Sequence, residues 1–92
     1  MLLPTRMAVL NHLEKVGTAN LEEVMENLKP MYGDEKQFNK ELYLDHLMAL
    51  EANGYLSLKN YKLGKDDELV LSFEITEDGQ QAVGKYVPKE YR

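Results

Sequence analysis

His46-Leu47-Met48-Ala49-Leu50-Glu51-Ala52-Asn53-Gly54-Tyr55-Leu56, residues 46–56, is the stretch in which the periodicity of the chain changes. Before Gly54, Leu47 and Leu50 follow the spacing of one helix face, which indicates a buried helical seam. From Leu56 onward the apolar residues alternate with polar ones, as in a half-buried strand. Glycine readily adopts the left-handed backbone that ends a helix. The stretch therefore predicts a helix that turns directly into a β-strand.

The alternation returns on a second stretch, so the chain predicts a β-hairpin. We expect strands at about residues 55–59 and 69–75, joined by a long polar tip that contains Gly64. Thr76 can cap a short helix at about residues 77–86. The apolar residues that alternate on the second strand are Leu69, Leu71, Phe73 and Ile75.

Three helices are predicted before the hairpin, at about residues 4–16, 20–29 and 34–53. Asn20 with Glu23 forms a capping-box pattern at the start of the second helix, and Pro30 is expected to end it. Asp34, with Gln37 three residues later, is expected to cap the third helix. The sequence thus predicts one α+β domain spanning residues 1–92, with three helices, a hairpin and a short last helix.

Composition argues against several classes of function. The 92 residues include no cysteine, which excludes disulfides and thiolate sites, and the formal net charge is −5. No glycine-rich phosphate loop or nucleophile elbow is visible, so we expect neither catalysis nor a cofactor. His12 and His46 lack the spacing of a metal motif, so no metal is expected.

The N-terminal residues and the hydropathy predict a cytoplasmic protein without a membrane partner. Pro4 and Arg6 interrupt the start of the chain before the hydrophobic region of a signal peptide can form. No apolar run approaches the roughly 20 residues that cross a bilayer.

Two strings resemble parts of a known fold. Residues 46–56 look like the end of a recognition helix turning into the wing of MarR-like and PadR-like bacterial regulators, and Glu74-Ile75-Thr76-Glu77-Asp78-Gly79 resembles their second wing strand entering the terminal helix. The resemblance implies a small winged-helix domain that binds double-stranded DNA and regulates transcription. The chain departs from these families in two respects. The stretch from the end of the second helix to Gly54 is several residues longer than a compact helix-turn-helix needs, and the terminal helix is short.

The resemblance also implies two DNA-contacting segments. Helix three would present side chains able to pair with bases or reach phosphates, and the wing would place lysines around an aromatic ring on the backbone. The residues implied in helix three are Lys36, Gln37, Asn39, Lys40 and Tyr43. Those implied in the wing are Lys59, Tyr61, Lys62 and Lys65.

Charge leaves a second interpretation open. Between Asp34 and Asn53, five acids (Asp34, Glu35, Glu41, Asp45, Glu51) oppose two lysines, and Asp66, Asp67 and Glu68 follow the wing lysines. The helix-three residues therefore fit an ordinary solvated surface slightly better than a DNA contact, and the wing fits either about equally well. The alternative function is a winged-helix module used for protein contact, as an adaptor or anti-regulator, through an acidic surface (Glu22, Glu26, Asp45, Glu51) and apolar residues (Met31, Tyr32, Leu63). Leu2 and Leu3 could pair two copies in a homodimer.

Overall fold

The computed structural model describes residues 2–92 and has an α+β fold of four α-helices and a three-stranded antiparallel sheet. The prediction of an α+β fold is confirmed. In chain order the elements are α1 (Thr5–Val16), β1 (Thr18–Asn20), α2 (Leu21–Tyr32), α3 (Lys40–Ala52), β2 (Leu56–Leu63), the 3-10 turn η1 (Lys65–Asp67), β3 (Leu69–Ile75), α4 (Glu77–Tyr86) and the 3-10 turn η2 (Lys89–Tyr91).

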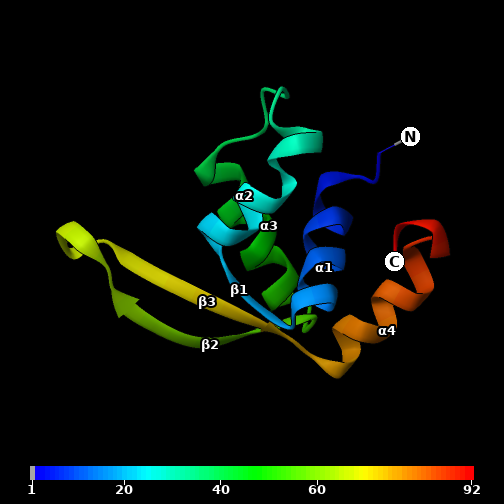
Figure 1. Ribbon diagram of the computed structural model, residues 1–92. Helices are drawn as coiled ribbons and strands as arrows, with labels where there is room; N and C mark the ends of the chain where they lie inside the picture. The colour runs from blue at the N-terminus through cyan, green and yellow to red at the C-terminus, as the bar shows by residue number, and fades with distance from the viewer. Residues whose placement is uncertain (1) are drawn as a thin grey trace.

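The sheet has the strand order β1-β3-β2, so β3 is central. The β2–β3 hairpin extends outward from the helices, and its tip is the part of the hairpin farthest from α4 (Figure 1). Strand β1 was not predicted from the sequence. Its three residues are too few for an alternating pattern, and it exists because Ala19 pairs with Phe73 of β3.

Several predicted helix ends are confirmed by their hydrogen bonds. The side chain of Asn20 accepts from the Glu23 amide, and the Glu23 side chain accepts from the Asn20 amide, each at 2.9 Å. Thr76 caps α4, whose predicted bounds are correct. Gly54 has φ +82°, the left-handed conformation predicted for the turn from helix to strand.

The prediction that Pro30 ends the second helix is wrong, because α2 continues to Tyr32. Tertiary contacts hold this last turn. The Tyr32 side chain is buried, and its hydroxyl donates to the carbonyl oxygen of Leu3 at 2.6 Å. The proline lies near the helix end, where the free energy gained from this packing outweighs one lost backbone hydrogen bond.

Helix α3 begins at Lys40, six residues later than predicted, and Asp34 does not cap it. Asn39 caps it instead: its backbone is extended, and its side chain accepts from the Leu42 amide at 2.9 Å. Residues 34–39 form turns that carry Phe38 inward, where its ring meets Tyr43 edge-on with the centroids 5.1 Å apart. This contact replaces the first turns of the predicted helix.

Strand β2 ends at Leu63, four residues beyond its predicted end. The sequence alternation fails at Lys59 because a bulge occurs there. Leu58 pairs with Phe73, and Asn60 pairs with the next residue of β3, Ser72. The extra residue shifts the side-chain alternation by one position, so the outer half of the strand does not continue the alternation of its inner half in the sequence.

The core lies between the helices and the inner end of the sheet. The helical seam predicted at Leu47 and Leu50 is buried, as are Leu56 and Phe73 of the hairpin. Helix α4 is held close to the hairpin base through Gly79, which is buried in its first turn against the backbone of Tyr55.

Candidate functional site

The predicted helix-three contacts Lys36, Gln37 and Asn39 lie in the turn before α3 and not on the helix. Lys36 and Gln37 are exposed there. The side chain of Asn39 caps the helix: its oxygen accepts from the Leu42 amide, and its Nδ2 donates to the Lys36 carbonyl oxygen at 3.4 Å. Their expected position in the N-terminal half of helix three is therefore wrong, because the helix begins only after its cap residue, Asn39.

Tyr43 was expected on the exposed part of helix three, but its side chain is only 1% exposed. Burial, with the nearby Glu35 charge, raises the pKa of Tyr43 to about 12. The rings of Phe38 and His46 pack edge-on against it. Tyr43 is thus a core residue, with too little exposed surface to act as a contact for DNA.

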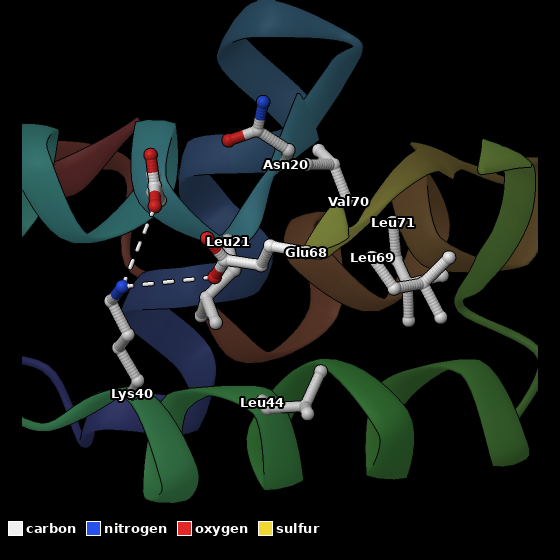
Figure 2. A pocket seen from close by; sticks show the side chains of 9 residues that line it. Asn20, Leu21, Lys40, Leu44, Glu68, Leu69, Val70 and Leu71 are labelled. Atoms are coloured by element: carbon white, nitrogen blue, oxygen red, sulfur yellow. Dashed lines mark hydrogen bonds and ion pairs between the residues drawn. The ribbon is translucent and has the colours of Figure 1, made fainter. Parts of the chain in front are cut away.

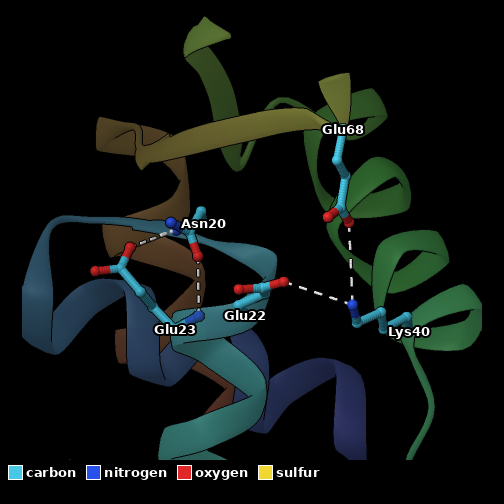
Figure 3. Close-up of polar contacts among 5 residues, drawn as sticks. All are labelled: Asn20, Glu22, Glu23, Lys40 and Glu68. Carbon is cyan, nitrogen blue, oxygen red and sulfur yellow. Dashed lines mark hydrogen bonds and ion pairs between the residues drawn. The ribbon is translucent and has the colours of Figure 1, made fainter. Parts of the chain in front are cut away.

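Lys40 is the first residue of α3, and carboxylates lie on two sides of it. Its ammonium nitrogen lies 3.5 Å from the Glu22 carboxylate and 4.0 Å from the Glu68 carboxylate (Figure 3). These contacts join the starts of α2, α3 and β3 at one point. Any phosphate binding at Lys40 would compete with both carboxylates.

The predicted wing residues do not share one face of the hairpin. Lys59 lies in the bulge and forms an ion pair with Glu74 at 3.1 Å. Tyr61 pairs with Leu71, and its neighbour Lys62 pairs with Val70, so the two side chains point to opposite faces. Lys65 lies in the tip, within η1. The arrangement of cations around an aromatic ring is therefore not formed on one surface.

The outward face of α3 is acidic and apolar. Glu41, Asp45 and Met48 are exposed on it, spaced as neighbours along one helical stripe. Lys40 is the only lysine within α3, and it is paired. This face gives α3 a negative surface.

The hairpin carries an apolar face, of which the sequence patterns predicted only the half on the second strand. Register pairs Leu58 with Phe73, Tyr61 with Leu71 and Leu63 with Leu69, which places all six side chains on one face. Phe73 is buried, whereas Leu58, Tyr61, Leu63 and Leu69 are 42%, 69%, 67% and 56% exposed. We call Leu58, Tyr61, Leu63, Leu69 and Leu71 the hairpin apolar face. It is the outward continuation of the hydrophobic core.

A small cavity lies between this face and the helices. Leu44 points from α3 toward Leu69 and Leu71, and Leu21 of α2 and Val70 of β3 also line the cavity (Figure 2). The cavity holds about 90 Å³, and Lys40 with its two carboxylates stands at the rim. Pockets for small-molecule ligands are several times larger, roughly 300–1,000 Å³. The cavity is therefore too small for most small-molecule ligands.

The two histidines are separated in the structure. His46 Nδ1 accepts a hydrogen bond from Arg6 at 3.2 Å, and burial followed by the Arg6 charge lowers the pKa of His46. Burial followed by the Lys15 charge lowers the pKa of His12. Within residues 2–92, no three His, Cys, Asp or Glu side chains converge as a metal site would require.

Comparison with protein-family models finds no match, and comparison with curated proteins finds none either. No helix within residues 2–92 is long and apolar enough to cross a membrane. The surface of the described residues is therefore the basis for a functional proposal.

Proposed function

We propose that this chain is a winged-helix module that contacts another protein through the hairpin apolar face and the adjacent side of α3. The order of three helices, a hairpin and a short last helix supports the winged-helix assignment, with β2 and β3 as the wing. The resemblance of residues 46–56 to the helix-to-wing turn of MarR-like and PadR-like regulators supports it independently.

The single observation that carries the protein-contact function is the continuity of the apolar face. The hairpin apolar face continues directly from the buried Phe73 and extends outward to Leu63, which is 67% exposed at the end of β2. Exposed apolar side chains gathered on one element mark interaction sites far more often than scattered ones. Large side chains such as Tyr61 supply much of the binding energy at protein interfaces.

Electrostatics favours a protein over DNA as the partner. Among the predicted DNA contacts, Lys40 and Lys59 are paired with carboxylates, and Tyr43 is buried. The outward face of α3 presents Glu41 and Asp45 where a major groove would approach. A negative helix is repelled by phosphates, whereas an apolar face bordered by charges suits a protein.

DNA binding, which the resemblance implies, is the function that this proposal sets aside, and it has a direct test. A fluorescently labelled mixed-sequence duplex is titrated with the protein at low and physiological salt, and its anisotropy is measured. We expect no saturable binding at micromolar protein at either salt concentration. Binding that falls steeply with salt, and that weakens in Lys62→Ala and Lys65→Ala, would overturn the preference for a protein partner.

A further inference from the structure

Strand β2 has unpaired backbone groups along its outer edge. It lies at the end of the strand order, so no strand within residues 2–92 pairs with that edge. The Gly64 amide donates to the Glu68 carbonyl oxygen at 2.7 Å, just beyond the pair of Leu63 with Leu69. In an antiparallel ladder, a bond at this position makes the adjoining pair a non-hydrogen-bonded one. The N–H and C=O groups of Leu63 therefore point away from β3.

The residues with outward backbone groups are also those with apolar side chains. Backbone direction and side-chain face both alternate along a strand. Lys62, which pairs with Val70, directs its backbone groups toward β3, whereas Tyr61 directs them outward as Leu63 does. The side chains of Tyr61 and Leu63 are exposed members of the hairpin apolar face. This edge thus offers hydrogen-bond donors and acceptors directly beside exposed apolar side chains.

The outer half of β2, residues 60–63, has few of the features that keep an edge strand from pairing. Such features include prolines, bulges and charged side chains. The bulge and the ion pair of Lys59 with Glu74 lie in the inner half of the strand. The outer half has no proline, and its one charged side chain, Lys62, lies on the face opposite Tyr61. A further strand can therefore reach this half of the edge.

We infer, on the basis of the proposed protein-contact function, that the partner supplies an extended segment that adds to β2 as an antiparallel strand. An extended backbone presents N–H and C=O groups at the same spacing as the outward groups of Tyr61 and Leu63. Both strand pairs of this sheet are antiparallel, the more stable arrangement. Segment residues opposite Tyr61 and Leu63 are apolar. At the hairpin tip, exposed Asp66 and Asp67 outnumber Lys65, so the segment carries lysine or arginine at its end there.

A synthetic peptide of seven residues tests this inference with the chain itself unchanged. Valine and threonine alternate along the peptide, and a lysine stands at each end. NMR spectra of the isotope-labelled chain report binding and the exchange rate of each amide hydrogen. In the free chain, the Tyr61 and Leu63 amides are expected to exchange at least about tenfold faster than the Lys62 amide. Saturation with the peptide is expected to slow both by at least about tenfold.

Methyl groups on the peptide nitrogens separate backbone pairing from side-chain contact. In the antiparallel pairing, the valine amides face β2 and the threonine amides face away. Methylating two valine nitrogens is expected to raise the dissociation constant at least about tenfold, and methylating both threonine nitrogens less than about threefold. Glutamate in place of both lysines is expected to weaken binding at low salt.

Three results would contradict strand addition. They are failure of the lysine peptide to bind at millimolar concentration, equal effects of the two methylations, and binding that leaves the Tyr61 and Leu63 amides unprotected. The last of these would still retain protein contact through the hairpin apolar face, so it separates this inference from the proposed function.

Discussion

Gly79 of α4 lies directly against the carbonyl group of Tyr55, so closely that a Cβ atom at residue 79 would overlap the Tyr55 carbonyl oxygen. The same Cβ would also approach the Ile75 side chain. Backbone cannot move aside as a flexible side chain can. This contact seats α4 at the base of the hairpin and makes the hairpin and the last helix one structural unit.

We expect Gly79→Ala to lower the free energy of unfolding by about 1–3 kcal/mol, the usual cost of overpacking a tight site. Urea denaturation followed by circular dichroism measures it. Gly84→Ala in the same helix is the control, because its Cβ would meet only the Arg92 side chain at 3.7 Å. That change is expected to stabilise the protein by up to about 1 kcal/mol, through helix propensity. Equal effects at both positions would contradict the proposed contact.

Thr76 links the same region through its hydroxyl. This group accepts from the Gly79 amide at 3.0 Å and donates to the Gly54 carbonyl oxygen at 2.6 Å. We expect Thr76→Ala to cost about 1–2 kcal/mol in unfolding free energy, and Thr76→Ser to cost clearly less. If serine proved as damaging as alanine, the hydroxyl would not be the stabilising group.

The two histidines predict a pH dependence of stability. Burial lowers the pKa of His12 and His46 from the ordinary value of 6.5 in the folded chain. As the pH falls below 6.5, the unfolded chain takes up protons that the folded chain does not, so the free energy of unfolding decreases. Well above 6.5 both states are neutral at these sites, and the histidines contribute no slope.

Urea denaturation at a series of pH values around 6.5 measures this dependence. The double variant His12→Gln with His46→Gln is expected to have a smaller slope in the histidine range, whereas carboxylates act at lower pH. A wild-type stability that rose on acidification through this range would contradict the lowered pKa values.

The ion pairs of Lys40 are expected to contribute little to stability. Its side chain is 62% exposed, and the carboxylates of Glu22 and Glu68 are also exposed to solvent. Lys40→Met should therefore change the free energy of unfolding by less than about 1 kcal/mol. Thermal or urea denaturation checks this, with Glu68→Gln as the companion variant. A loss of several kcal/mol would mean that these contacts organise the fold.

Local signals in the sequence were sufficient for much of this fold. The capping pair Asn20 and Glu23, the cap at Thr76 and the left-handed turn at Gly54 act within a few residues, and each forms as predicted. Features that depend on tertiary contacts were missed. The last turn of α2 depends on Tyr32 reaching Leu3, and β1 depends on a strand more than fifty residues away.

The candidate site was harder to predict for the same reason. The bulge at Lys59 is defined only by pairing with β3, and without it the outer half of β2 looks like a polar loop. Tyr43 was expected in the exposed N-terminal half of a helix that starts at Asp34. The helix instead starts at Lys40, and Tyr43 is one of its buried residues. Lys40 and Lys59 were expected to contact DNA. The carboxylates that pair with them, Glu22 and Glu74, lie on other elements, so the sequence around each lysine does not reveal the ion pair.

Site-specific photo-cross-linking from the hairpin tests the central claim most directly. A photoreactive phenylalanine analogue replaces either Tyr61 or Lys62, which are neighbours on opposite faces of β2. After irradiation in cells, we expect a discrete protein adduct from position 61 and little from position 62. The adduct should disappear when Leu63→Asp is added. Adducts to DNA, or equal protein adducts from both positions, would contradict the account.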